Sequence, residues 1–427
     1  MLPKETHPQF HLFYGWYILA SSFTMLFFNS GARYSFGVMF KPMIAEFGWS
    51  RGSISLGLSL NIILWASSLI FVGRLYDRFG PKWIIIISTL FISAGYALMA
   101  GVNSLWQFYI YYGILVAVGM TGTSVPIIAA LTSKWFEKWR GLAISLALSG
   151  NCLGQFALVP LFTFFSLRFG WRASYLSIGI IMLLVNISLA LFVIRGDPGD
   201  LDERPFGCQD QGGREGEGGY ISSVNDPNDL GLREAMRTYS FWLFLIAMFV
   251  CGSGDFLITT HLIPFVTDQG ISATTAGNML AWFGLMSLVG ILAAGPASDL
   301  IGNKIPVALT FFLRFLSFLL ILRYQNVTSY YAFSFIFGFT YLITGTLIPT
   351  TMGRLYGFSH IGLICGFVTT IHHLGGGFWA YMGGWIFDRT GSYRLAFILS
   401  AVMAMVAFFS CILIREKRHS RPVGSAV

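Results

Sequence analysis

The sequence predicts an all-α membrane protein in which twelve transmembrane helices form two pseudo-symmetric six-helix bundles around a central cavity. Composition is the first reason: 55% of the 427 residues are hydrophobic and only 11% are charged. Soluble globular proteins carry about 25% charged residues, so this chain has too few to cover a water-exposed surface. The mean hydropathy of +0.68 suits a chain whose solvent is lipid. The number of apolar stretches and an internal repeat are the other two reasons.

Twelve apolar stretches are long enough to cross a bilayer of roughly 30 Å at about 1.5 Å per residue. The first six cover approximately residues 14–40, 54–76, 83–102, 105–132, 141–167 and 173–194. The second six cover approximately residues 239–266, 274–297, 305–322, 329–352, 361–387 and 395–414. The chain therefore divides into an N-terminal bundle (1–194), a linker (195–237) and a C-terminal bundle with a short tail (238–427).

The linker differs in composition from the rest of the chain. It holds ten of the nineteen acidic residues and a glycine-rich run at 212–219, which favours a flexible connection. With the N-terminus placed inside, 18 of the 27 Lys and Arg residues are cytoplasmic, seven are external and two lie within spans. The positive-inside rule therefore predicts that both termini and the linker are cytoplasmic. Short outer loops favour a bacterial inner membrane.

Several function classes are disfavoured. The net charge of +8 is spread over short loops, and no basic cluster with interleaved aromatic residues suggests nucleic acid as a partner. The five cysteines (152, 208, 251, 365 and 411) show neither disulfide pairing nor metal-ligand spacing. Hydrolase and P-loop motifs are missing, so we expect neither an enzyme nor a cofactor. The tails and linker are too short for the signalling domain of a receptor.

An internal repeat relates the two sets of spans at a shift of 221 to 223 residues. The segment Gly73–Lys82 (GRLYDRFGPK) recurs as Gly295–Lys304 (GPASDLIGNK), and GTSVP at 122–126 recurs as GTLIP at 345–349. Tandem halves of like orientation imply a pseudo-twofold axis along the membrane normal. Such an arrangement suits a carrier that works by rocking, with a monomer as its functional unit.

The segment 73–82 resembles the G-x-x-x-D-R-x-G signature of the major facilitator superfamily, and 295–304 is a degenerate copy. The resemblance implies a conformational gate formed by Gly73, Asp77, Arg78 and Asp299. A carboxylate at a helix end beside a neighbouring helix N-terminus fits this role electrostatically. We expect Asp77 to latch the outward-facing state without touching substrate.

Longer stretches resemble the bacterial monocarboxylate-transporter and oxalate:formate-antiporter group of that superfamily. They lie at 14–19, 34–38, 46–51, 134–143, 261–268 and 372–393. The resemblance implies transport of small carboxylates with proton coupling or anion exchange, driven by a gradient. Relatives carry an anion-binding Arg and often an Asp in the eighth span, where this chain has Ile291 and Ser287. The site would then rely on His372 and Arg33, or the substrate is not a simple carboxylate.

Ionisable residues inside spans are costly and are default functional candidates. We expect Asp255, His372 and His373 to take part in proton coupling. The resemblance places His372 where oxalate exchangers carry a substrate-pairing Lys, and a His there is a titratable cation for a carboxylate. Adjacent helical residues point about 100° apart, so only one of the two histidines can face the cavity fully.

Other polar residues lie at plausible depth for a substrate pocket. Arg33 either attracts the anion, pairs with Asp255 or snorkels to the interface, whereas Arg314 in a peripheral span favours a structural role. Asn151 matches His372 in the repeat, so one polar group from each half is expected at the axis. The further substrate-binding candidates are Tyr34, Asn61, Tyr112 and Tyr341. An efflux carrier for uncharged or hydrophobic compounds is the alternative function, although the fifth span lacks the Gly-Pro-rich antiporter motif.

Overall fold

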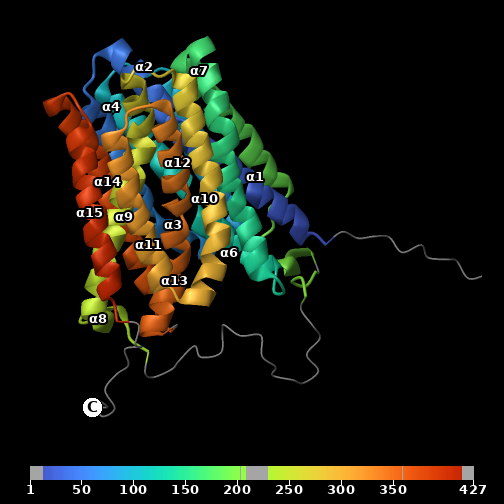
Figure 1. The fold of residues 1–427 in the computed structure, drawn as a ribbon. Coiled ribbons are helices and arrows are strands. Elements are labelled where there is room, and N and C mark those ends of the chain that lie inside the picture. Colours follow the sequence, from blue (N-terminus) through green and yellow to red (C-terminus); the bar gives the residue numbers. More distant parts are fainter. Residues whose placement is uncertain (1–12, 202, 208–228, 358, 416–427) are drawn as a thin grey trace, which may run out of the picture.

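The computed structural model describes residues 13–201, 203–207, 229–357 and 359–415, and these fold into a bundle of long helices (Figure 1). The first set is α1 (Gly15–Tyr34), α2 (Phe36–Phe47), α3 (Arg51–Met99), α4 (Leu105–Phe108), the π-helix η1 (Tyr109–Val116), α5 (Ala117–Thr121), α6 (Val125–Trp135) and α7 (Arg140–Phe192). The second set is α9 (Tyr239–Asp268), α10 (Ala273–Ile301), α11 (Lys304–Arg323), α12 (Val327–Tyr341), α13 (Ile343–Tyr356), α14 (Ile361–Thr390) and α15 (Arg394–Leu413). The short helices η2 (Pro198–Leu201) and α8 (Leu232–Ala235) belong to the linker.

These elements give twelve membrane crossings within the described residues. Nine helical runs there are long and apolar enough to cross a membrane. Two of them, α3 and α7, turn back at Gly80 and Gly170 and so supply two crossings each. The remaining crossing is α1 followed by α2, whose junction lies at Ser35. The predicted all-α membrane fold is therefore confirmed.

The internal repeat is visible in the backbone. Three pairs of glycines with positive φ are 221 or 222 residues apart: Gly48 and Gly270, Gly80 and Gly302, and Gly170 and Gly391. Gly80 and Gly302, from the repeated signature, share almost the same geometry, with φ 77° in both and ψ 166° and 174°. A side chain at such a φ is strained, so the turn after each signature helix favours glycine.

The described ends of both halves lie on one side of the bundle, which we name the linker side. Tyr14 contacts the linker, because its backbone N–H donates to Glu203 (3.2 Å) and its hydroxyl donates to the Val193 carbonyl (2.8 Å). At the other end of the chain, the backbone N–H of Arg415 donates to Ser240 at the start of α9 (3.4 Å). We name the opposite side of the bundle the far side. It contains the turns at 48–50, 100–104, 269–272, 324–326 and 391–393.

The two halves meet chiefly through α3 on α14 and α7 on α10. Hydrogen bonds and ion pairs between spans of the two halves gather at mid-depth and toward the far side. Examples are Gln155 donating to the Leu280 carbonyl (2.9 Å) and Ser59 donating to the Gly377 carbonyl (2.6 Å). Within the described residues, these contacts close the structure toward the far side.

Candidate functional site

The centre of the candidate site lies on α9, a helix that other helices surround. Residues 240–266 of this helix are almost all buried, including Ser253, Asp255 and His261. Its close packing against α14 depends on glycine, since a Cβ at Gly252 would collide with the His372 carbonyl and one at Gly375 with the Phe249 carbonyl. Small residues let two backbones approach in this way. The approach places His372 beside Asp255.

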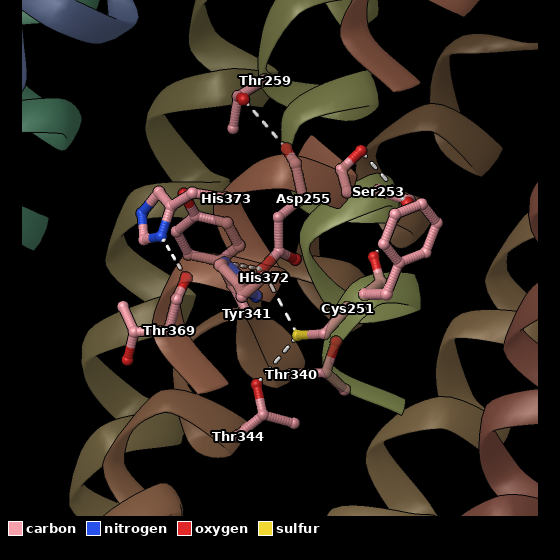
Figure 2. Close-up of polar contacts among 12 residues, drawn as sticks. Cys251, Ser253, Asp255, Thr259, Thr340, Tyr341, Thr344, Thr369, His372 and His373 are labelled. Atoms are coloured by element: carbon pink, nitrogen blue, oxygen red, sulfur yellow. Dashed lines mark hydrogen bonds and ion pairs between the residues drawn. The ribbon is translucent and has the colours of Figure 1, made fainter. Parts of the chain in front are cut away.

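Asp255 forms an ion pair that spans three helices. Its carboxylate lies 2.8 Å from Nη2 of Arg314 on α11 and 3.7 Å from Nε2 of His372 on α14. The Cys251 thiol lies 3.5 Å from the same carboxylate (Figure 2). The side chains of Asp255 and Arg314 are 4% and 2% exposed, whereas His372 keeps 19% of its surface accessible. The buried carboxylate thus has a permanent cation on one side and a titratable, accessible base on the other.

Arg314 is a member of this site, whereas the sequence favoured a structural role for it and offered Arg33 as a partner of Asp255. The guanidinium donates to three backbone carbonyls, those of Cys251 (3.3 Å), Thr340 (3.2 Å) and Tyr341 (3.3 Å). It also packs on the Phe337 ring, 4.8 Å from its centroid. A buried guanidinium needs this many acceptors to offset its desolvation.

Cys251, Asp255 and His372 are also arranged as metal ligands would be, with one candidate ligand atom from each within 4.8 Å of the others. The sequence showed no ligand spacing for such a cluster, because Cys251 and His372 are far apart in the chain. Arg314 already contacts both the carboxylate and the Cys251 sulfur, the latter at 3.3 Å. A permanent cation at that position opposes a divalent ion by charge repulsion, so we assign no metal here.

Arg33 is the second arginine inside a span, and its surroundings are different. It is half-buried and forms no ion pair with any described residue. Its guanidinium carbon lies 5.3 Å from the Trp65 ring centroid in the first half and 5.2 Å from the Phe256 ring centroid in the second. Arg33 therefore presents an uncompensated positive charge between the halves, where aromatic faces hold it by cation–π attraction.

The other predicted substrate and proton residues near Arg33 and Asp255 make different contacts. Tyr34 and Tyr341 meet each other, with their hydroxyls 2.8 Å apart across the two halves. His373 lies next to Arg33's aromatic partner, with its ring 4.6 Å from that of Trp65, and its Nδ1 donates to the Thr369 carbonyl at 2.7 Å (Figure 2). The backbone carbonyl of Asn151 accepts from the Ser30 hydroxyl within the first half.

Asn61 and Tyr112 have packing roles in this structure. The Asn61 side-chain amide donates to the backbone carbonyl of Tyr112 at 2.7 Å. Tyr112 lies in the π-helix η1. Its ring is buried and stacks on Phe36 and Phe108, with centroids 4.7 and 5.7 Å away. A substrate contact by these two residues stays a prediction.

The signature residues lie beside the linker-side turn at Gly80 within α3 and at the linker-side end of α10. Asp77, Arg78 and Asp299 are exposed, and none of the three forms an ion pair with another described residue. A Cβ at Gly73 would meet no atom within 4 Å. In this structure, which is closed at the far side, these three charged side chains are thus not joined to one another or to another described charge by an ion pair. Their gating role stays a prediction.

A charged cluster at the far side joins the halves and was not predicted from the sequence. Arg51 holds Asp268 through two nitrogens at 2.6 and 2.9 Å, and Lys41 approaches the same carboxylate at 2.6 Å. Asp388 accepts from the backbone N–H groups of Arg51 and Gly52 at 3.0 and 2.8 Å, and so caps α3 from the opposite half. Arg51, Lys41, Asp268 and Asp388 are referred to below as the far-side cluster. In the sequence they appear only as charges near span ends.

Replacing Asp268 by asparagine is expected to weaken far-side closure, because Lys41 and Arg51 both lose their shared carboxylate. For a partly exposed pair we expect about a 5- to 20-fold rise in the open population. Hydrogen exchange at the first amides of α3 reports this opening, since Asp388 is the acceptor of those at Arg51 and Gly52. Glu46→Gln is the matched control, because Glu46 pairs with Arg172 within one half (2.7 Å). Equal exchange in both variants would contradict the assignment.

Comparison with known proteins supports this architecture. The model of the Major Facilitator Superfamily matches residues 22–272 and 243–426. An uncharacterized MFS-type transporter, YcxA of Bacillus subtilis (strain 168), is 27% identical, with 95% of this chain and 98% of that protein covered. Monocarboxylate transporter 13 of Bos taurus is 25% identical (92% and 87% covered). The oxalate:formate antiporter of Oxalobacter formigenes is 24% identical (96% and 94% covered).

Solved structures show the same fold. A bacterial homologue of the human lysosomal transporter Spinster, in an inward-facing and unoccupied conformation, superposes with a TM-score of 0.75 at 16% identity. The alignment covers 96% of this chain and 99% of that one. With nearly the whole chain matched by the family model, twelve crossings and a repeated signature turn, the protein belongs to the major facilitator superfamily and is a multi-pass membrane transporter.

Proposed function

We propose that the protein is a secondary active transporter of small organic anions, namely mono- or dicarboxylates, that works by alternating access. The observation that carries this proposal is Arg33, a half-buried and unpaired cation between the two halves at mid-membrane. A charge held there without a counter-ion is costly, and an anionic substrate supplies the missing partner. Similarity to a monocarboxylate transporter and an oxalate:formate antiporter points to the same substrate class.

In this proposal, Arg33 takes the place of the anion-binding cation that the resemblance led us to expect in the eighth span. Arg314 is unsuited to this task, because Asp255 neutralises it and both side chains are buried. A carboxylate drawn to Arg33 would find the aromatic faces of Trp65 and Phe256 around it. Such a site binds an anion with one charged end and tolerates an apolar remainder.

We propose that Asp255 and His372 carry the coupling proton. The imidazole is the accessible member of the pair and lies 3.7 Å from a carboxylate whose other neighbour is Arg314. Protonated His372 would add a second positive charge to the site and favour a bound anion, whereas neutral His372 would favour its release. Anion exchange without protons is the other energy source that this site allows.

Far-side closure supports an inward-facing state in our proposal, with the linker and both termini in the cytoplasm of a bacterial cell. The far-side cluster then seals the exterior, and the signature residues Asp77 and Asp299 would engage only when the halves rock the other way. The rocking moves one six-helix bundle against the other about the central site.

Uptake by proteoliposomes tests the function. The purified protein is reconstituted, and radiolabelled lactate, pyruvate, formate and oxalate are offered with and without an inward proton gradient, with His372→Ala in parallel. We expect gradient-driven uptake of at least one carboxylate and its loss in the variant. Uptake that requires internal anion and ignores pH would identify an exchanger. Failure of all four anions would refute the proposed substrate class and favour the export of uncharged or hydrophobic compounds.

A further inference from the structure

The tenth membrane crossing is interrupted at Leu342, where α12 ends and α13 begins. The last carbonyls of a helix have no intrahelical partner and attract cations. Arg314 meets this need: its Nη2 donates to the carbonyls of Thr340 (3.2 Å) and Tyr341 (3.3 Å), and its Nε donates to the Thr340 hydroxyl (3.3 Å). One side chain from α11 thus fixes the position of the α12 end.

The other side of the break is tied to Asp255 as well. The Thr344 hydroxyl, in the first turn of α13, lies 3.0 Å from the Cys251 sulfur (Figure 2). The same sulfur lies 3.5 Å from the Asp255 carboxylate. Asp255 therefore reaches the end of α12 through Arg314 and the start of α13 through Cys251, so the break and the buried ion pair form one connected unit.

Tyr341 connects the break and the buried ion pair to the first half of the protein. It is the last residue of α12, and its hydroxyl is 2.8 Å from that of Tyr34 at the end of α1. Both side chains are buried, and the Tyr341 ring also packs on Phe283 with centroids 4.9 Å apart. A hydrogen bond between buried hydroxyls joins the halves next to Arg33, and it must break when the halves separate there.

We propose that Arg314 is a positioning residue that holds the α12 end so that Tyr341 latches onto Tyr34, and that this latch links the buried ion pair to the far-side-closed state. The proposal rests on the proposed function only in assuming that the halves rock. It assigns to Tyr34 and Tyr341 a conformational role in place of the substrate contact expected from the sequence. The Asp255–Arg314 ion pair and the proposed substrate cation Arg33 are thereby both connected to the break at Leu342.

Deleting single hydroxyls tests the latch without disturbing the packing. Tyr34→Phe, Tyr341→Phe and the double variant are compared by hydrogen exchange at the first amides of α3 in lipid nanodiscs, with no substrate present. Loss of one neutral hydrogen bond is expected to raise opening about fivefold. The double variant should match the single ones, because both hydroxyls belong to one bond. Tyr330→Phe is the control, since that hydroxyl on the same helix is buried without a partner.

Arg314→Lys separates positioning from charge balance. Lysine keeps the positive charge beside Asp255, but its single ammonium cannot replace the three nitrogens of Arg314. Those nitrogens donate to the Cys251 carbonyl (Nη1), to the Thr340 and Tyr341 carbonyls (Nη2) and to the Thr340 hydroxyl (Nε). We expect the same rise in exchange as in Tyr341→Phe, and no further rise when the two changes are combined. Wild-type exchange in a folded Arg314→Lys protein, or an additive double variant, would overturn the proposal. Hydrogen exchange is measured without substrate, so it tests the Tyr34–Tyr341 latch even if the protein transports none of the carboxylates in the uptake assay.

Discussion

Replacing Arg33 by glutamine is expected to reduce carboxylate uptake about 30- to 150-fold in kcat/KM. The change removes the unpaired charge from between the Trp65 and Phe256 rings, and a charge-assisted contact of this kind contributes about 2–3 kcal/mol. Arg33→Lys should recover part of the activity, because it restores the charge without the planar fork. Initial rates in proteoliposomes over a range of substrate concentrations measure the effect.

The control for this experiment is Arg323→Gln. Arg323 is exposed at the far-side end of α11 and contacts the ring of its neighbour Tyr324. The Arg323→Gln variant should show uptake within a factor of two of the wild type, since an exposed charge far from the site contributes little interaction energy. Normal transport by Arg33→Gln would show that the anion is bound elsewhere. Equal losses in both variants would indicate an effect of net charge and not of a site.

Removing Arg314 while Asp255 remains is expected to destabilise the protein more than any other change considered. Arg314→Gln leaves a carboxylate with 4% exposure and no permanent cation, and breaking a buried pair in this way costs about 3–5 kcal/mol. We expect a low yield of monodisperse protein and a clearly lower thermal midpoint in detergent. Asp255→Asn combined with Arg314→Gln should recover most of the stability, because neither charge then remains buried.

The double variant also tests the proton role of Asp255. If Asp255 and His372 carry the coupling proton, the stable double variant should exchange substrate across the membrane without accumulating it in response to a proton gradient. Accumulation equal to that of the wild type would remove Asp255 from the coupling mechanism. A double variant no more stable than Arg314→Gln alone would show that Arg314 acts mainly through the carbonyls at the α12 end.

The sequence predicted the features that depend on composition and spacing. The apolar stretches defined the crossings to within a few residues, and the repeated signature already indicated two related halves, whose paired glycines share a positive φ. Charge within a span also selected Asp255, Arg33 and both central histidines as candidates. Each of these inferences follows from the energy of placing one residue type in lipid, which does not require knowledge of its neighbours.

The contacts between distant residues were decided only by the tertiary structure. Asp255 pairs with Arg314, which is 59 residues away on another helix, and not with Arg33. The breaks at Leu342 and Ser35 and the π-helix η1 lie inside single hydrophobic stretches, so the hydropathy pattern did not reveal them. The far-side cluster likewise joins residues from opposite halves.

The amino-acid sequence thus determined how often this chain crosses the membrane. It also identified the ionisable residues inside the membrane spans, which are candidates for a functional role because burial of a charge in lipid is costly. The tertiary structure decided that Asp255 is paired with Arg314, and that Arg33 has no ion-pair partner among the described residues. The physical reason is that burial in lipid is a property of a single residue, whereas an ion pair depends on the positions of two helices. That relative position is set by close backbone packing, as at Gly252 against α14.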